Sequence, residues 1–385
     1  MSWKVSKLGD ILTITSGGTP SRQKNEYYDN GQVPWVKTGD LKKKYIDGEV
    51  EKITELALKD SSAKLFPPQT VLFALYGATI GACSILRIEA ATNQACAAFL
   101  PNEKIVPEFL FYYLQTRKQD LIRQGQGGAQ PNISGAILKR YPIPLPPLET
   151  QKRIVELLDR AQGLIDKRKE QIALMDDLIQ SLFYEMFGDP VTNPKGWEVK
   201  KLCSLGSLKR GKSKHRPRNA PELLGGIYPL VQTGDIANAG LYLKTYSQTY
   251  SELGLAQSKL WNRGTLCVTI AANIAKTAIL DFDACFPDSV VAFLPSKDVD
   301  NMYVQLWFGF LQKIIEANAP ESAQKNINLQ ILSDLDIPVP PIDLQTQFAE
   351  RVQKIEAQKE AMNASLKELE ENFQSIMQRA FKGEL

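Results

Sequence analysis

The chain has few of the residues that carry metal-ion or nucleophilic chemistry. Its 385 residues include a single histidine, His215, and five cysteines, an odd number with no pair in C-x-x-C spacing. A Ser-His-Asp site needs a histidine beside a nucleophile, a zinc site needs clustered ligands, and scattered cysteines form no disulfide framework. The sequence therefore predicts no catalytic residue, no metal and no cofactor of its own, and it suits a reducing cytoplasm.

The chain also lacks a long hydrophobic segment. Its most apolar run, Thr70 to Leu86, is short and is interrupted by Gly77 and Gly81, whereas a membrane helix needs about 20 apolar residues in succession. The N-terminus has no apolar signal-peptide core. With 43% hydrophobic and 23% charged residues, the composition is typical of a soluble globular protein, and we expect no membrane association and a cytoplasmic location.

Two segments of about forty residues carry an apolar heptad pattern. In residues 148–187, apolar side chains recur in alternating steps of four and three, and Arg168 alone interrupts the series. The pattern returns in residues 342–385, where Lys359 is the interruption. A seam of this length requires a second helix packed along it, so the sequence predicts two long helices that form an intramolecular coiled coil.

The rest of the chain repeats itself at a distance of 194 or 195 residues. Short predicted strands, broken by glycine and proline, fill both copies. Matching positions preserve a tryptophan, a Thr-Gly-Asp triplet and the two prolines before each long helix, at Trp3 and Trp197, 38–40 and 233–235, and 146–147 and 340–341. Such a series indicates an internal duplication, with divergent loops between the matched strands.

The expected fold is therefore α+β, with two similar globular domains separated by a long antiparallel coiled coil. The expected parts are a first domain over 1–147, a helix over 148–187, a second domain over 188–341 and a helix over 342–385. The chain usually enters and leaves a compact domain at neighbouring points, so the second helix should return antiparallel to the first. The expected architecture is a dumbbell with a pseudo-two-fold axis.

The charges differ between these parts. The first domain carries 18 lysine and arginine against 13 aspartate and glutamate residues, and the second carries 16 against 14. Each helix carries 6 against 8. Basic domains on acidic helices suit a protein whose domains contact a polyanion and whose helices contact another protein.

Several motifs resemble those of the specificity subunits of type I restriction-modification systems, and the resemblance spans the whole chain. They are the junctions IPLPPLETQKRI and IPVPPIDLQTQF, the segment FGDPVTNPKGW, the loop GGAQPNIS and the terminal AFKGEL. The resemblance implies a non-catalytic subunit whose two target-recognition domains each read one half of a split, asymmetric site in double-stranded DNA, while the helices set the spacing.

The resemblance also implies partners. Two modification subunits would dock on the helices, bring S-adenosylmethionine and methylate adenine, and restriction subunits would join that core. The chain itself lacks an adenine-methyltransferase signature, because Asn193-Pro194 is followed by Lys195-Gly196. A coiled-coil scaffold without DNA binding is the main alternative.

Residues 206–213 also satisfy the letter of the phosphate-binding pattern G-x-x-x-x-G-K-[ST]. That loop must lead into a helix, but Pro217 and Pro221 follow closely, and the matching segment 16–19 has no lysine. We therefore reject nucleotide binding and interpret the segment as a loop that contacts DNA phosphates.

The candidate DNA-binding residues lie in basic loops of both domains. In the second domain they are Lys209, Arg210, Lys212, Lys214, Arg216 and Arg218. In the first domain they are Arg22, Lys24, Lys42, Lys43 and Lys44. Arginine and glutamine commonly read base edges, which adds Arg123, Gln124, Gln126 and Gln130.

Overall fold

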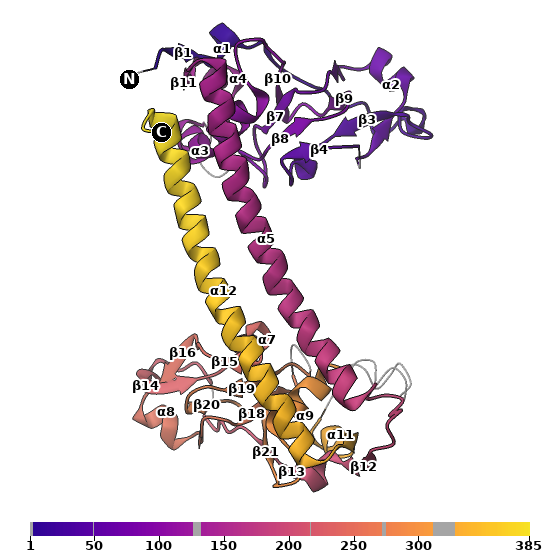
Figure 1. Cartoon of the computed structure of the whole chain (residues 1–385), viewed down its shortest axis with the longest axis vertical. Helices are drawn as coiled ribbons and strands as arrows, with labels where there is room; N and C mark the ends of the chain where they lie inside the picture. Colours follow the sequence, from indigo (N-terminus) through magenta and orange to yellow (C-terminus); the bar gives the residue numbers. More distant parts are fainter. Residues whose placement is uncertain (1–2, 49, 126–131, 216, 272–274, 311–327) are drawn as a thin grey trace. The chain divides into compact units, whose positions relative to one another are not determined.

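The computed structural model describes residues 3–48, 50–125, 132–215, 217–271, 275–310 and 328–385. Two compact units are present: unit 1 comprises Met1–Lys169 with Ala364–Leu385, and unit 2 comprises Glu170–Asn363. The division falls within two long helices, α5 (Leu148–Phe187) and α12 (Ile342–Lys382), each of which runs unbroken in Figure 1. Each unit therefore contains one half of α5 and one half of α12.

A five-stranded sheet forms the centre of unit 1. Its order is β2 (Ile14–Ser16), β10 (Cys96–Phe99), β7 (Val71–Ala74), β8 (Cys83–Leu86) and β4 (Tyr45–Ile46). The pairs are antiparallel, except that β4 runs parallel to β8.

Both faces of this sheet are buried. Alternate side chains of β7 divide between two clusters: Val71 and Phe73 face the core shared with α3 (Pro107–Gln124), while Leu72 and Ala74 face a second core. This period of two is that of a strand covered on both sides.

Unit 1 has two smaller sheets. One has the order β5 (Lys52–Ile53), β3 (Val33–Val36), β9 (Ala90–Thr92) and β6 (Leu65–Phe66). The other pairs β1 (Val5–Lys7) with β11 (Pro142–Pro144), which places the first strand beside the proline-rich segment that enters α5. Short helical segments complete the unit: α1 (Leu8–Ile11), η1 (Asn25–Tyr27), η2 (Thr38–Asp40), α2 (Glu55–Asp60) and α4 (Gly135–Arg140).

Unit 2 repeats this topology. Its five-stranded sheet has the order β13 (Gly206–Arg210), β21 (Val290–Pro295), β18 (Leu266–Thr269), β19 (Thr277–Leu280) and β15 (Tyr242–Leu243). Its smaller sheets are β16 (Gln248–Tyr250), β14 (Leu224–Leu230), β20 (Ala284–Cys285) and β17 (Leu260–Trp261), and the pair β12 (Glu198–Lys201) with β22 (Asp336–Val339). The strand order matches unit 1 position by position, which confirms two similar α+β domains.

The helices of unit 2 also have counterparts in unit 1. They are α6 (Leu202–Leu205), η3 (Pro221–Leu223), α7 (Thr233–Asn238), α8 (Glu252–Ala256), α9 (Asn301–Phe308) and α11 (Leu329–Ser333). Helix α9 packs against β19 and takes the place that α3 has against β8. The expected four-part division of the chain stays a prediction, because the compact units divide inside the long helices.

The halves of α5 and α12 pack against each other within each unit, and their relative direction can be followed in unit 2. In unit 2, Asp176 pairs with Lys359, and eleven residues later the Phe187 ring lies 4.9 Å from that of Phe348. In unit 1, the Lys169 amine lies 2.8 Å from the Glu370 carboxylate. Because residue numbers on α12 fall as those on α5 rise, the predicted direction is confirmed within unit 2.

The two polar interruptions of the heptad seam are accommodated differently. The Lys359 side chain is 19% exposed and its charge is neutralised by Asp176, since a charge in a mainly apolar seam needs a partner. Arg168 is half-buried. The apolar seam positions near the helix ends, such as Leu158 and Val352, are fully buried.

A buried glutamine joins each domain to its helix. The Gln151 side chain accepts from the Val106 amide at 2.9 Å and donates to the carbonyls of Pro146 and Lys104 at 2.9 and 3.0 Å. Gln345 makes the matching contacts in unit 2, with the Asp300 amide at 2.9 Å and the carbonyls of Pro340 and Asp298 at 2.7 and 3.3 Å. Three bonds to one buried amide fix the start of each helix on its domain.

Candidate nucleic-acid interface

The basic segment of unit 2 starts on a strand, so the prediction of a loop over residues 206–213 is wrong for residues 206–210, which pair with β21. Lys209 and Arg210 are exposed at the end of β13, and Lys212 and Lys214 are exposed just beyond it. No helix follows at 211–215, so the segment has none of the loop-to-helix geometry that holds a nucleotide phosphate. The strand supports the sequence-based rejection of that alternative.

Close packing accounts for the glycine of the apparent phosphate motif. A Cβ on Gly211 would lie 2.3 Å from the Pro287 carbonyl oxygen and 2.4 Å from that of Phe286. Gly17, its counterpart in unit 1, is equally close to the Thr92 carbonyl, at 2.0 Å. In both units the glycine lets the chain pass close to a neighbouring backbone.

Backbone contacts hold the basic segment in place. The Gln257 side-chain oxygen accepts from the amides of Lys214 and His215, at 2.6 and 3.1 Å. The Ser258 hydroxyl donates to the Lys212 carbonyl at 2.8 Å. Because these bonds use the main chain, the amines of Lys212 and Lys214 stay available at the surface.

The other two predicted residues of this segment are Arg216 and Arg218. The Arg218 guanidinium lies 2.5 Å from the Asp288 carboxylate, so part of its charge is neutralised within the protein. Arg216 lies outside the described residues. Gln257, Ser258 and Asp288 could not be found from the sequence, since they lie 42 to 70 residues from the groups they bind.

In unit 1, Arg22 belongs to a charged and aromatic cluster. Its guanidinium makes two bonds to the Glu51 carboxylate, at 2.5 and 2.9 Å, and lies 4.3 Å from the centre of the Tyr28 ring. The Lys37 amine binds the same carboxylate at 2.8 Å. The hydrogen bond from Arg22, assisted by Lys37, lowers the pKa of Glu51 to about 2.

The neighbouring Lys24 is also engaged. Its amine lies 2.9 Å from the Tyr27 hydroxyl and close to the ring of the same tyrosine, and both Lys24 and Arg22 remain about half exposed. Such partial exposure allows either cation to reach a phosphate if it exchanges its present partner.

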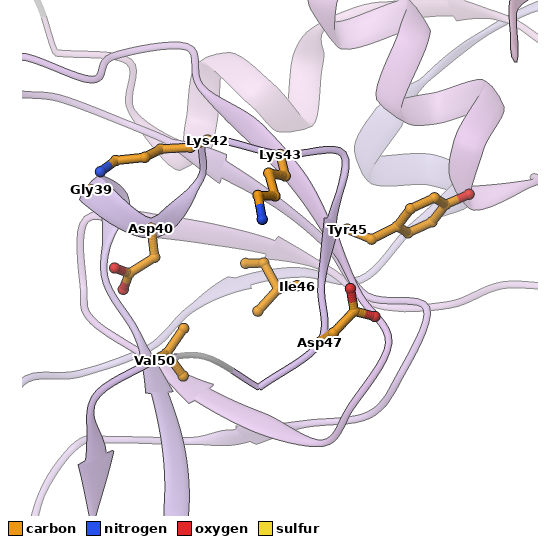
Figure 2. Close-up of a pocket in the computed structure, with 8 residues that line it drawn as sticks. All are labelled: Gly39, Asp40, Lys42, Lys43, Tyr45, Ile46, Asp47 and Val50. Carbon is orange, nitrogen blue, oxygen red and sulfur yellow. The ribbon is translucent and has the colours of Figure 1, made fainter. Parts of the chain in front are cut away.

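Three consecutive lysines precede β4, and they divide into two groups. Lys42 and Lys43 are exposed and line a hollow of about 410 Å³ together with Asp40, Ile46 and Asp47. Figure 2 shows Lys43 and Ile46 directed into this hollow and the ring of Tyr45 directed away from it.

Lys44 points inward instead. Its amine pairs with Asp159 on α5, lies 3.5 Å from the Tyr112 hydroxyl and leaves the side chain only 19% exposed. Lys44 is therefore the least accessible of the predicted DNA-contact residues that the structure describes in this loop.

The candidates on α3 lie on its last turn. Arg123 and Gln124 are exposed, and both contact Asp120, at 3.7 and 3.1 Å. Gln126 and Gln130 lie outside the described residues. Asp120 also accepts from the Tyr141 hydroxyl at 2.5 Å, so it anchors this end of α3 to the segment that leads to α5.

The described part of the chain offers binding groups and little reactive chemistry. Four cysteines are buried, and burial raises the pKa of Cys96 to about 12, so its thiol is protonated at neutral pH. Within the described residues, no three His, Cys, Asp or Glu side chains form a group that could hold a metal ion. The same residues include no helix long and apolar enough to span a membrane.

The chain is similar to known specificity subunits. It is 32% identical over 240 residues to the type I restriction enzyme MjaIX specificity subunit of Methanocaldococcus jannaschii, covering 57% of this chain and 54% of that protein. It is 30% identical over 194 residues to the EcoR124I/EcoR124II specificity subunit of Escherichia coli, covering 49% and 47%. The matched part thus spans about half the length of these relatives.

Wider comparisons cover the whole chain. A chain in a solved structure on complex assembly and conformational transition of the type I R-M system matches 100% of this chain and 98% of its own length, with a TM-score of 0.68. At 19% identity, this likeness concerns the fold alone. The family described as "Type I restriction modification DNA specificity domain" matches residues 1–174 and again residues 194–371. The chain therefore belongs to the type I restriction-modification DNA specificity family, and it carries two copies of the family's domain.

Proposed function

We propose that this chain is the non-catalytic, sequence-reading subunit of a type I restriction-modification enzyme. Each domain reads one half of a bipartite site in double-stranded DNA. The observation that carries the proposal is the duplicated fold with basic residues in the corresponding segments, although not at the same positions: the segments after β2 and β13 hold Arg22 and Lys24 in unit 1 and Lys212 and Lys214 in unit 2.

The two copies differ where they would meet DNA, which supports an asymmetric site. Unit 1 presents Arg22 on the Glu51 carboxylate and Lys42 and Lys43 beside a hollow, whereas unit 2 presents a segment held by Gln257. Different side chains on one framework recognise different base sequences. A homodimer with identical readers would instead require a palindromic site.

The long helices offer surfaces for the modification subunits. In the unit 1 half of α5, Leu157 and Leu164 lie seven residues apart and are 40% and 55% exposed. In the unit 2 half, Leu174 and Leu178 are 54% and 47% exposed. Apolar pairs outside the buried seam are suited to a partner helix, and one pair per unit supports two modification subunits.

The catalytic groups would then belong to the partners. The modification subunits would supply S-adenosylmethionine and methylate adenine, and the restriction subunits would supply cleavage. The described structure holds its cysteines as free thiols, which is typical of proteins in the reducing cytoplasm.

The deciding experiment combines the chain with its modification subunit and maps methylated adenines in DNA. A bipartite, asymmetric consensus is the expected result. Binding to that consensus is then measured across a series of salt concentrations for the wild type and for Lys212→Ala with Lys214→Ala. Removing one lysine–phosphate interaction should reduce the slope of log K against log salt by about 0.9, so the double variant should reduce it by up to about 1.8.

Lys297→Ala is the control, because Lys297 is an exposed lysine in another loop of unit 2. It should leave the slope unchanged. The double variant should affect only the half-site that unit 2 reads. Methylation without any consensus, or an unchanged slope in the double variant, would count against the proposal and would favour a scaffold that does not read DNA.

A further inference from the structure

The edge strand of the central sheet is tied to a long helix in unit 1. Strand β4 has two residues and pairs with β8 alone. Directly before it, the Lys44 amine binds the Asp159 carboxylate on α5, and the Tyr112 hydroxyl of α3 donates to the same oxygen. The aromatic rings of Tyr112 and Tyr45 lie 4.7 and 5.2 Å from the amine.

Unit 2 ties its equivalent strand with different residues. Strand β15 also has two residues and occupies the same edge of the sheet. Lys244, directly after it, pairs with Glu360 on α12. Directly before it, the Leu241 carbonyl accepts from the buried Gln305 of α9 at 2.7 Å. An ion pair between the edge strand and a long helix therefore occurs in both units, although the residues that form it are not at matching positions.

The position of β4 decides where the loop with Lys42 and Lys43 lies, and this loop is called the reading loop of unit 1. Lys42 and Lys43 precede Lys44 without an intervening residue, and the hollow that they line continues through Tyr45 to Asp47. A strand of two residues has few ladder bonds, so contacts beyond the sheet must define its orientation. In unit 1, Asp159 joins the loop to the long helix, while the Ser84 hydroxyl binds the Lys43 carbonyl at 2.6 Å and the Tyr45 hydroxyl binds Glu108 of α3 at 3.0 Å.

We propose that the ion pair Lys44–Asp159 is a positioning contact that fixes the loop with Lys42 and Lys43 at a set angle to α5, and that Lys244–Glu360 orients the loop after β15 on α12 in the same way. This inference rests on the proposed function. It assigns Lys44 a role different from phosphate binding, because a side chain that is 19% exposed and whose amine is already bound by a carboxylate is poorly placed to contact DNA.

The two ties should differ in strength. The Lys44 and Asp159 side chains are 19% and 43% exposed, whereas those of Lys244 and Glu360 are 47% and 56% exposed. Solvent screens exposed pairs more strongly. The larger effect is therefore expected in the half-site that unit 1 reads.

The two roles of Lys44 predict opposite results for Asp159→Asn. If Lys44 positions the loop, Asp159→Asn and Lys44→Met should each weaken specific binding by roughly tenfold, and the double variant should be no weaker than the worse single variant. If Lys44 contacts a phosphate, Asp159→Asn should leave affinity unchanged or raise it, because the amine is released. Lys44→Met would then reduce the salt slope by about 0.9.

The measurement uses the complex with its modification subunit and DNA in which the spacer between the half-sites is native, one base pair shorter or one base pair longer. A positioning role predicts that Asp159→Asn weakens the preference for the native spacer while the consensus bases stay the same. Lys43→Met is the matched control, since it removes the adjacent exposed lysine and should lower the salt slope without changing the spacer preference. Thermal unfolding of each variant identifies a general loss of fold.

The outcomes separate the two proposals. A wild-type complex without any sequence preference would defeat the proposed function. A wild-type complex that selects its site, with Asp159→Asn equal to it in affinity and in spacer preference, would overturn the positioning role alone. A gain in affinity for Asp159→Asn would also overturn the positioning role and would indicate that Lys44 contacts a phosphate.

Discussion

The carboxylate of Glu51 should make the stability of unit 1 depend on pH. Its pKa is lowered from 4.5 to about 2, mainly by the hydrogen bond from Arg22 and further by Lys37. A group whose pKa is lower in the folded state stabilises the fold above its unfolded value and loses this effect as the pH falls toward its folded value. The relevant window therefore runs from about pH 4.5 down to about pH 2.

The size of the effect follows from that difference in pKa. The difference between 4.5 and about 2 corresponds to at most about 3 kcal/mol at neutral pH. The side chain of Glu51 is 28% exposed, and those of Lys37 and Arg22 are 40% and 52% exposed, so screening should reduce the contribution to about 1–2 kcal/mol. At pH 3 it should be about two-fifths of its neutral value.

Glu51→Gln removes the ionisable group and should remove this pH dependence. The variant should be about 1–2 kcal/mol less stable than the wild type at pH 7, and the difference should shrink at pH 3. The Trp35 amide is a local probe, because it donates to the Glu51 backbone carbonyl at 2.7 Å. Pulsed hydrogen exchange at increasing urea, read by mass spectrometry on peptides covering β3, gives the unfolding midpoint at each pH.

Peptides from β18 of unit 2 serve as an internal reference, and Glu26→Gln is the control variant. Glu26 is 61% exposed and lies 3.9 Å from Lys24, so its loss should change the midpoint little at either pH. Equal differences between Glu51→Gln and the wild type at pH 7 and pH 3 would refute the reasoning, because they would show that the charge of Glu51 contributes nothing to the fold.

Three further outcomes are expected. Leu158→Ala in the buried seam should lower the free energy of unfolding in urea by about 2–5 kcal/mol. Leu157→Ala next to it, where the side chain is 40% exposed, should change stability by less than about 0.5 kcal/mol and weaken binding of the modification subunit. Equal losses of stability in the two variants would contradict the assignment of Leu158 alone to the seam. Gln151→Leu should cost about 2–4 kcal/mol, because it leaves a buried amide and two carbonyls unpaired, and an unchanged unfolding midpoint would argue against the junction. One heptad inserted after Lys169 and another after Ser365 should lengthen the helices by ~10 Å and increase the preferred spacer by about three base pairs in a methylation map, whereas an unchanged spacer would refute the role of the helices as a ruler.

The helices and the duplication could be predicted from the sequence because both are encoded locally. A heptad pattern predicts a helix without reference to the rest of the chain. Helices α5 and α12 begin directly after the two proline pairs, as predicted. The matched prolines and the Thr-Gly-Asp triplets revealed the repeat. The sheets could not be predicted, because most of the strands have only two to four residues and carry little periodicity, and because the parallel pairs, such as β3 with β9, join distant segments.

The site was predictable as a set of charges but not as a set of contacts. Sequence composition identified the basic segments, yet it could not separate Lys43 from Lys44, which are neighbours in sequence and point in different directions. The partners that separate them are far away along the chain: Asp159 lies 115 residues from Lys44, and Glu51 lies 29 residues from Arg22. Ion pairs of this range depend on the tertiary fold.

The contrast between the two kinds of junction suggests how the protein keeps one architecture while its specificity changes. Gln151 and Gln345 make the same three bonds in both copies, because the start of the helix must have the same geometry wherever the domain is used. The ties at β4 and β15 use unrelated residues, since each must suit its own loop. A domain transplanted with its loops but without the helix residue that it contacts should therefore fold on the new helix and yet hold its reading loop at the wrong angle.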